Sequence, residues 1–113
     1  MIAENTQTQM RKGILEYCIL SIIGREETYA SDIIAELKRA QLLVVEGTLY
    51  PLLTRLKNNG LLTYNWVEST SGPPRKYYSL SPEGKEVLAQ LDKTWKELSF
   101  AVQTAVAKKT KNL

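Results

Sequence analysis

Histidine is absent from the chain, and cysteine occurs once, at Cys18. Without histidine the chain lacks the commonest general base and the commonest metal ligand in proteins. A single cysteine forms no disulfide within the chain and cannot build a metal cluster, and among its apolar neighbours we expect a buried, inert thiol. The sequence also offers no phosphate-binding loop. We therefore expect neither an enzyme nor a bound cofactor or metal.

Long hydrophobic runs are missing as well. No apolar run approaches the roughly 20 residues that a helix needs to span a bilayer. Residues 13–24, after Arg11 and Lys12, superficially resemble a signal peptide, but Glu16 interrupts their apolar centre and residues 24–27 offer no cleavage pattern. These features predict a cytoplasmic protein without membrane contact.

The size and charge of the chain fit a single soluble domain. It has 113 residues, of which 43% are hydrophobic, enough for one core. Lysine and arginine number 15 against 12 acidic residues, which gives a net charge of +3. This excess is mild, so the placement of the basic residues indicates a partner better than their number does.

Two helices are predicted in the first third of the chain. Residues 1–8 are polar and patternless, which predicts a flexible arm. From Gln9 to Ile23 apolar residues recur at helical spacing. Thr28 is a candidate N-cap for a second helix that runs to Ala40.

A third helix carries a row of leucines on its inner face and ends at Gly60. Pro51 is awkward inside it, because proline lacks the backbone N–H that a helix interior requires. The helix therefore begins either near Tyr50, or near Glu46 with a bend at Pro51. The inner-face leucines are Leu49, Leu52, Leu53 and Leu56.

A hairpin and a long helix complete the predicted elements. Residues 61–67 and 76–80 are rich in strand-forming side chains, and the polar stretch between them predicts a loose tip. Ser81 is a candidate cap for a last helix that begins with Pro82 and runs to about Lys108. Residues 109–113 then form a basic tail.

The order of these elements defines the fold class. Three helices followed by a hairpin and a further helix indicate a mainly α protein, a winged helix-turn-helix with a three-helix core and a two-stranded β wing. We assign residues 9–80 to this DNA-binding domain and residues 81–108 to a long C-terminal dimerisation helix. In this fold the third helix enters the major groove of DNA.

Polar and basic side chains cover the predicted outer face of the third helix and the hairpin tip. Hydroxyl, amide and cationic groups of this kind contact phosphates and base edges, although a merely solvated helix face has the same composition. The basic hairpin favours the first interpretation. The outward residues of the helix are Thr48, Tyr50, Thr54, Arg55, Lys57 and Asn58, and those of the tip are Ser71, Gly72, Arg75 and Lys76.

Two motifs in this region resemble a known family. Residues 46–56 (EGTLYPLLTRL) with residues 59–62 (NGLL) resemble the recognition-helix signature of PadR regulators, and residues 72–84 (GPPRKYYSLSPEG) resemble their wing and last helix. The similarity extends from residue 10 to about 106. It implies a repressor-type regulator that binds a palindromic operator in double-stranded DNA as a homodimer and is released by a small molecule or stress signal.

The resemblance also implies roles for individual residues. It places DNA contacts at the opening of the third helix, on its exposed face, on the wing and at the start of the second helix. Thr48, Tyr50 and Pro51 open the third helix, and Arg55 lies on its exposed face. Arg75 and Lys76 belong to the wing, and Tyr29 and Ser31 to the start of the second helix. One departure is Val45, where many relatives place a serine able to cap the recognition helix, and it leaves the start of that helix open.

The last helix carries an apolar seam at heptad spacing. At about 1.5 Å per residue the helix is about 40 Å long, more than the small core can cover, so the seam indicates a second copy of the chain. The alternative is that it folds back on the first helix of its own chain. The seam is Leu88, Leu91, Trp95, Leu98 and Val102, and by resemblance Ile14, Leu15 and Cys18 of the first helix join the interface.

Trp95 lies in the middle of this seam and has two interpretations. It resembles the tryptophan with which some multidrug-sensing PadR relatives stack planar ligands between subunits, which makes it a candidate ligand-binding residue for a small-molecule effector. Tryptophan in a heptad stripe more often only fills interface volume.

A different class of function fits the same fold. A winged-helix protein-interaction module would have this architecture without binding DNA. Salt-dependent binding to duplex DNA distinguishes the two, because phosphate contacts release counterions and a protein interface need not.

Overall fold

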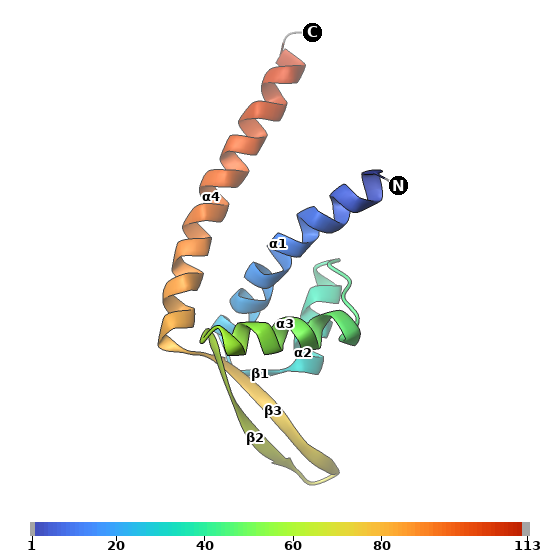
Figure 1. Ribbon diagram of the computed structural model, residues 1–113, viewed down its shortest axis with the longest axis vertical. Coiled ribbons are helices and arrows are strands. Elements are labelled where there is room, and N and C mark those ends of the chain that lie inside the picture. The colour runs from blue at the N-terminus through green and yellow to red at the C-terminus, as the bar shows by residue number, and fades with distance from the viewer. Residues whose placement is uncertain (1, 112–113) are drawn as a thin grey trace.

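The computed structural model describes the backbone of residues 2–111 and the side chains of residues 3 and 5–107. Within this range, the chain forms helices and a three-stranded antiparallel sheet of order β1-β3-β2 (Figure 1). The mainly helical winged fold predicted from the sequence is confirmed. The elements are α1 (Ile2–Arg25), β1 (Thr28–Tyr29), α2 (Ala30–Arg39), α3 (Glu46–Asn58), β2 (Leu62–Ser69), β3 (Gly72–Leu80) and α4 (Pro82–Lys111).

The core lies where α1, α2 and α3 meet the base of the β2–β3 hairpin. The leucines predicted for the inner face of α3 are all buried there, because their spacing places them on one side of the helix. The outer part of the hairpin, which we call the wing, projects from this body (Figure 1). The fully buried side chains are Ile19, Leu20, Ile33, Leu37, Leu49, Leu53 and Leu56.

Helix α1 begins earlier than the sequence predicted. The expected start at Gln9 is wrong, since the helix includes residues 2–8, which were assigned to a flexible arm. No glycine or proline precedes Gly13 to interrupt the backbone hydrogen-bond ladder, so the helix continues beyond the part that packs on the core. Residue 1 lies outside the described residues.

Thr28 does not cap α2, contrary to the prediction. Together with Tyr29 it forms β1, which pairs with Tyr78 and Tyr77 of β3, and its side chain is buried. The N-cap of α2 is Tyr29, in extended conformation and without a side-chain cap bond. A strand of two residues is too short to leave an alternating pattern in the sequence. Its pairing ties the start of α2 to the inner end of β3.

The predicted loose hairpin tip is also wrong. Strands β2 and β3 extend until Ser69 pairs with Gly72, which leaves only residues 70–71 between them, with an irregularity between Val67 and Ser69. Pro73 and Pro74 are tolerated in β3 because β1 pairs only with its inner end, so the outer part of β3 has an open edge that needs no N–H donor.

Helix α3 begins at Glu46 and contains Pro51, which decides between the two predicted starts. Its N-cap Val45 offers no side-chain bond, and the backbone N–H groups of Thr48 and Leu49 donate to the Val45 carbonyl oxygen at 3.0 Å. Gly60 ends the helix in a left-handed conformation, with φ of +80°, as the sequence predicted.

Ser81 links the end of α3 to the start of α4. Its hydroxyl accepts a hydrogen bond from the Gly84 backbone N–H at 2.9 Å, which confirms the predicted cap, and donates to the Gly60 carbonyl oxygen at 2.5 Å. Helix α4 continues past Lys108 to Lys111. Of the predicted basic tail, 109–111 are helical with side chains outside the described set, and 112–113 lie outside the described residues.

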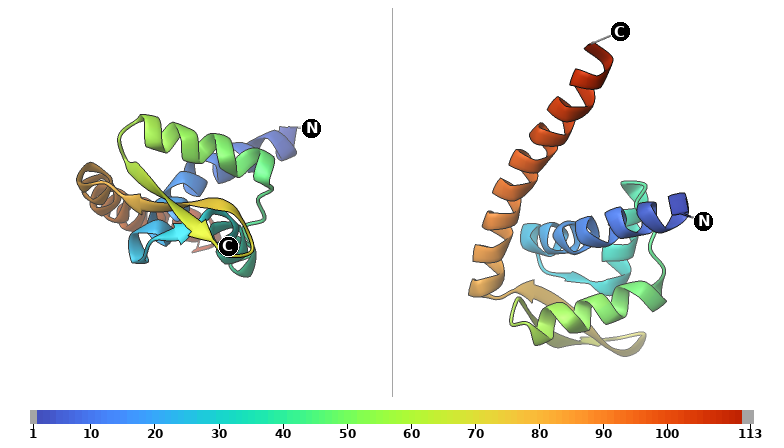
Figure 2. Two further views of the ribbon diagram at one scale, coloured as in Figure 1. Left: turned by 90° about the horizontal axis from the view of Figure 1, so that it is seen from below. Right: turned by 45° about the horizontal axis from the view of Figure 1, so that its top comes forward.

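The two long helices diverge from a common base. Figures 1 and 2 show α4 running away from α1, with its C-terminal half beside no other element of the chain. The molecule therefore measures 63 Å along its longest axis against 32 Å along the next. The alternative that α4 folds back on α1 therefore holds only for its N-terminal half, where Tyr17 of α1 contacts Asp92 and Trp95.

Candidate nucleic-acid interface

A cleft of about 420 Å³ lies between the start of α2, the exposed face of α3 and the wing. We call it the wing cleft. Among the described residues that line it none is acidic, whereas two are cationic and five carry a hydroxyl. Such a surface donates hydrogen bonds and attracts negative charge. Its lining is Tyr29, Ala30, Ser31, Tyr50, Thr54, Trp66, Pro74, Arg75, Lys76 and Tyr78.

Arg75 holds the wing against the start of α2. Its Nη2 donates to Ser31 Oγ at 2.5 Å, and its guanidinium lies 4.0 Å from the centre of the Tyr29 ring. Because β1 pairs with β3, Tyr29 also packs on Tyr77, with ring centres 4.7 Å apart. The three predicted residues Tyr29, Ser31 and Arg75 thus form one cluster, although 44 positions separate Ser31 from Arg75.

A second cluster joins the wing to α3. Lys76 Nζ lies 4.5 Å from the centre of the Tyr64 ring and 5.4 Å from that of Trp66, and Lys57 Nζ lies 5.6 Å from Tyr64. Lys57 and Lys76 were predicted, whereas Tyr64 and Trp66 were missed. The available signal was their alternation with Leu62, which places all three on one face of β2.

The exposed side chains of α3 lie in three different environments. Tyr50 and Thr54 line the wing cleft. Thr48 instead lines an apolar groove beside α1, which Pro51 shares. Arg55 is exposed but forms an ion pair with Glu16 of α1, with 2.6 Å between Nη2 and Oε1.

The remaining predicted contacts lie apart from the cleft. Ser71 and Gly72 are exposed at the tip of the wing, and Asn58 lies near the end of α3 beside a shallow hollow. Within the cleft, burial raises the pKa of the Tyr78 hydroxyl, with smaller contributions from Tyr50 and Tyr64. A tyrosine hydroxyl is already neutral at pH 7, and a raised pKa leaves Tyr78 a hydrogen-bond donor there.

The residues predicted for a dimer interface fall into two groups. Trp95, Leu98 and Val102 of α4 are exposed, at 42%, 52% and 52%. Leu15 is only 9% exposed because it packs in the core of its own chain, which argues against its place in an interface. The other four are partly buried. Cys18, Leu88 and Leu91 pack against the same core, and Ile14 lines a hollow between α1 and α4.

An apolar hollow of about 300 Å³ separates α1 from α4 around Trp95. We call it the α1–α4 hollow. The Tyr17 hydroxyl donates to Asp92 Oδ1 at 2.6 Å beside it, and the Tyr17 and Trp95 rings lie 6.5 Å apart. Its lining is Met10, Gly13, Ile14, Tyr17, Leu91, Thr94, Trp95 and Leu98.

The part of the chain that the structure describes holds no group of three metal-ligating side chains of the His, Cys, Asp and Glu types. Nor is any helix within it long and apolar enough to cross a membrane.

Comparisons with solved structures find close relatives of this fold. A PadR-like transcription factor from Bacteroides fragilis is 62% identical, with a TM-score of 0.77, over 88% of this chain and 96% of that one. A PadR family transcriptional regulator from Eggerthella lenta is 32% identical, with a TM-score of 0.81, over 93% and 92%. The PadR protein of Bacillus subtilis, solved in complex with operator DNA, is 26% identical, with a TM-score of 0.64, over 69% of this chain and 46% of that one.

Sequence comparisons agree with the structural ones. An uncharacterized protein from Lysinibacillus sphaericus is 29% identical over 90 residues, which cover 77% of this chain and 83% of the relative. Residues 19–90 match the family model described as the transcriptional regulator PadR-like family. Since this match spans more than half of the chain, the protein belongs to the PadR-like family of transcriptional regulators.

Proposed function

We propose that the chain is a sequence-specific DNA-binding repressor that acts as a homodimer on a palindromic operator. The observation that carries the proposal is the wing cleft, in which the start of α2, the face of α3 and the wing present cations and hydroxyls together. Phosphate oxygens accept hydrogen bonds from such groups and supply most of the affinity of a protein for DNA. The relative solved with operator DNA has the same fold.

In this proposal α3 enters the major groove. Tyr50 and Thr54 then reach base edges or the adjacent phosphates, and Arg75 and Lys76 of the wing contact the backbone. The bond between Arg75 and Ser31 fixes the wing relative to α2, so the contacting groups are arranged before DNA binds.

A second copy of the chain covers the exposed apolar side of α4. Trp95, Leu98 and Val102 lie on that side, beyond the part of α4 that packs on the core. Two copies related by a two-fold axis present two α3 helices to half-sites about one helical turn apart, which makes the operator palindromic. A dimer bound there represses by occupying the operator.

The α1–α4 hollow is the site at which an effector would act. Its lining is apolar and includes the Trp95 ring, which suits a flat organic molecule. Such a ligand releases DNA only if it prefers a form of the dimer that binds DNA poorly. Titration of planar cationic dyes should quench Trp95 fluorescence saturably and weaken operator binding, whereas an unquenched Trp95 across a broad dye panel would leave it as interface packing.

Selection from a randomised duplex library tests the proposal as a whole. The selected sequences should share a palindrome, and sedimentation should find two chains on each duplex. Absence of any salt-dependent binding to duplex DNA would contradict the proposal and favour the protein-interaction module instead.

A further inference from the structure

We infer that Trp66 contacts DNA and that the wing cleft holds the sugar–phosphate backbone of one duplex strand, between the groove entered by α3 and the next. The inference rests on the proposed function. It adds a further DNA-contacting residue, Trp66, and names the part of the DNA that this residue contacts.

The register of the hairpin places Trp66 in the cleft. Trp66 pairs with Lys76 and Leu62 pairs with Leu80, and directly opposed residues lie on the same face of an antiparallel pair. Positions 62 and 66 are an even number of residues apart, so Trp66 lies on the face that begins in the core beside α3. Farther out, that face lines the cleft together with Tyr50 of α3.

The indole of Trp66 is held in place without being covered. It is 61% exposed, although tryptophan is highly buried on average. The Tyr64 ring meets it edge to face, at 6.1 Å and 88°, and Lys76 Nζ lies over both rings. A partner that covers this ring therefore gains apolar contact at a small entropic cost, because the side chain is already held in one position.

The chemistry of the cleft selects the backbone of duplex DNA as the occupant. Arg75, Lys76 and the cleft hydroxyls suit phosphate oxygens, and no described lining residue opposes them with a carboxylate. The faces of Trp66 and Pro74 suit the C–H groups of deoxyribose, and the indole Nε1–H can donate to a phosphate. Bases in a duplex are stacked on each other, so the indole meets sugar there, whereas in a single strand it would meet a base.

Fluorine NMR of the full chain labelled with 5-fluorotryptophan tests the inference. The chain has two tryptophans, and the Trp66→Phe variant assigns the two resonances. We expect the Trp66 resonance to shift saturably with the selected operator duplex, with half-saturation at the dissociation constant measured by fluorescence anisotropy.

Affinity measurements provide the second readout. Trp66→Ala should weaken binding to operator and random duplexes alike by about tenfold, as expected for a modest loss of apolar contact. The slope of affinity against salt should stay unchanged, because a neutral side chain releases no counterion. Asn65→Ala, on the opposite face of the same strand, is the matched control and should bind as the unmodified chain does.

Three results would overturn the inference. A Trp66 resonance that does not move while the duplex binds, with Trp66→Ala of unchanged affinity, removes Trp66 from the interface and leaves the proposed function intact. A larger shift and tighter binding with single-stranded DNA than with duplex makes the cleft a base-stacking site. No duplex binding by the unmodified chain refutes the inference together with the proposed function.

Discussion

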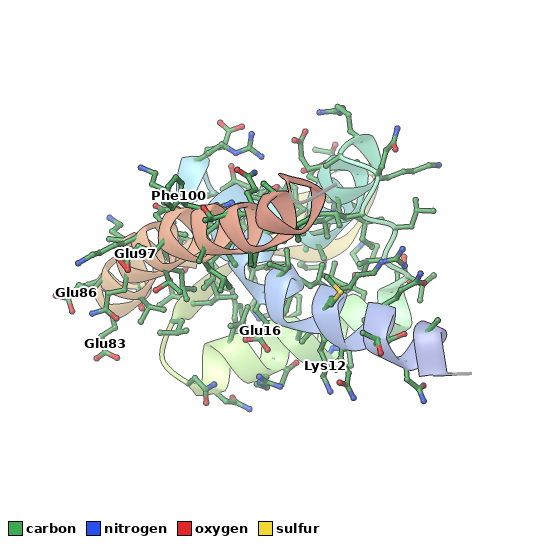
Figure 3. All side chains as sticks on the ribbon, turned by 90° about the horizontal axis from the view of Figure 1, so that it is seen from above. Lys12, Glu16, Glu83, Glu86, Glu97 and Phe100 are labelled. Carbon is green, nitrogen blue, oxygen red and sulfur yellow. The ribbon has the colours of Figure 1, made fainter. Side chains whose placement is uncertain are left out.

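Arg55 of α3 and Glu16 of α1 form an ion pair, with 2.6 Å between Nη2 and Oε1. In Figure 3 Glu16 lies on the side of α1 that is next to α3. The contact joins the helix proposed to enter DNA to the helix that lines the α1–α4 hollow. Since the Arg55 side chain is 57% exposed, a DNA phosphate can compete with the Glu16 carboxylate for the same guanidinium.

The first prediction follows from this competition. Glu16→Gln should strengthen binding to duplex DNA by up to about fivefold, which corresponds to the free energy of a typical exposed ion pair. It should also steepen the dependence of affinity on salt by about one unit of slope. Fluorescence anisotropy across a salt series measures both. Glu97→Gln is the control, since it removes the same charge from an ion pair with Lys93 on α4. Equal effects of the two variants would contradict a direct competition.

Tyr17 should make stability depend on alkaline pH. Its hydrogen bond to Asp92, together with burial and the charge of that carboxylate, raises the pKa of Tyr17 above its ordinary value of 10.0. Because the pKa of the folded state is the higher one, the native state keeps the proton, so the stabilisation is full below pH 10 and is lost as pH rises through the raised pKa.

Tyr17→Phe should therefore be less stable than the unmodified chain at pH 7, by about 1 kcal/mol for the lost hydrogen bond. The difference should shrink above pH 10, because the ionised tyrosine no longer donates to Asp92. Urea unfolding from pH 7 to 11 measures it. A constant difference over that range would show that the bond does not control the titration.

Gly84 has no room for a side chain. A Cβ at this position would lie 2.1 Å from the Leu61 carbonyl oxygen, a backbone atom that cannot move without disturbing the Ser81 cap beside it. Gly84→Ala should lower the free energy of unfolding by about 3 kcal/mol or more, measured by urea denaturation. Gly13→Ala, with no atom within 4 Å of its Cβ, should leave stability unchanged or slightly raised. Similar values for both variants would contradict this packing.

The proposed dimer makes a prediction for α4. Leu98→Asp combined with Val102→Asp should leave a folded monomer, because both side chains are exposed in the single chain and only a partner would bury the new charges. Sedimentation equilibrium and circular dichroism measure the two properties. Gln90→Asp with Gln103→Asp, at other exposed positions of the helix, should remain dimeric. A stable dimer of the apolar-face variant would place the interface elsewhere.

Periodic patterns predicted most of the fold, because burial repeats along the chain. The leucines of α3, the stop at Gly60 and the cap at Ser81 each depend on neighbours within a few residues, so sequence alone determined them. The family assignment likewise confirms the expectation that the chain is a regulator and not an enzyme.

The features that sequence missed depend on distant partners. Thr28 becomes a strand residue only because Tyr78, fifty positions later, pairs with it. Arg55 faces Glu16 because α1 crosses beside α3, and Trp66 joins the wing cleft because the register of β2 and β3 places it opposite Lys76. Alternation along β2 indicates the face on which Trp66 lies, but no local pattern records which distant residue it meets, since such pairings are fixed by the packing of elements.

The salt dependence of duplex binding by the unmodified chain, Arg75→Ala and Lys76→Ala tests the central claim most directly. We expect the unmodified chain to bind the selected operator with an affinity that falls steeply as salt increases. Each alanine variant should bind operator and random DNA more weakly, with a slope smaller by about one unit, because a phosphate contact is lost. Binding that is insensitive to salt, or affinity unchanged in both variants, would contradict the role of the wing cleft in binding DNA.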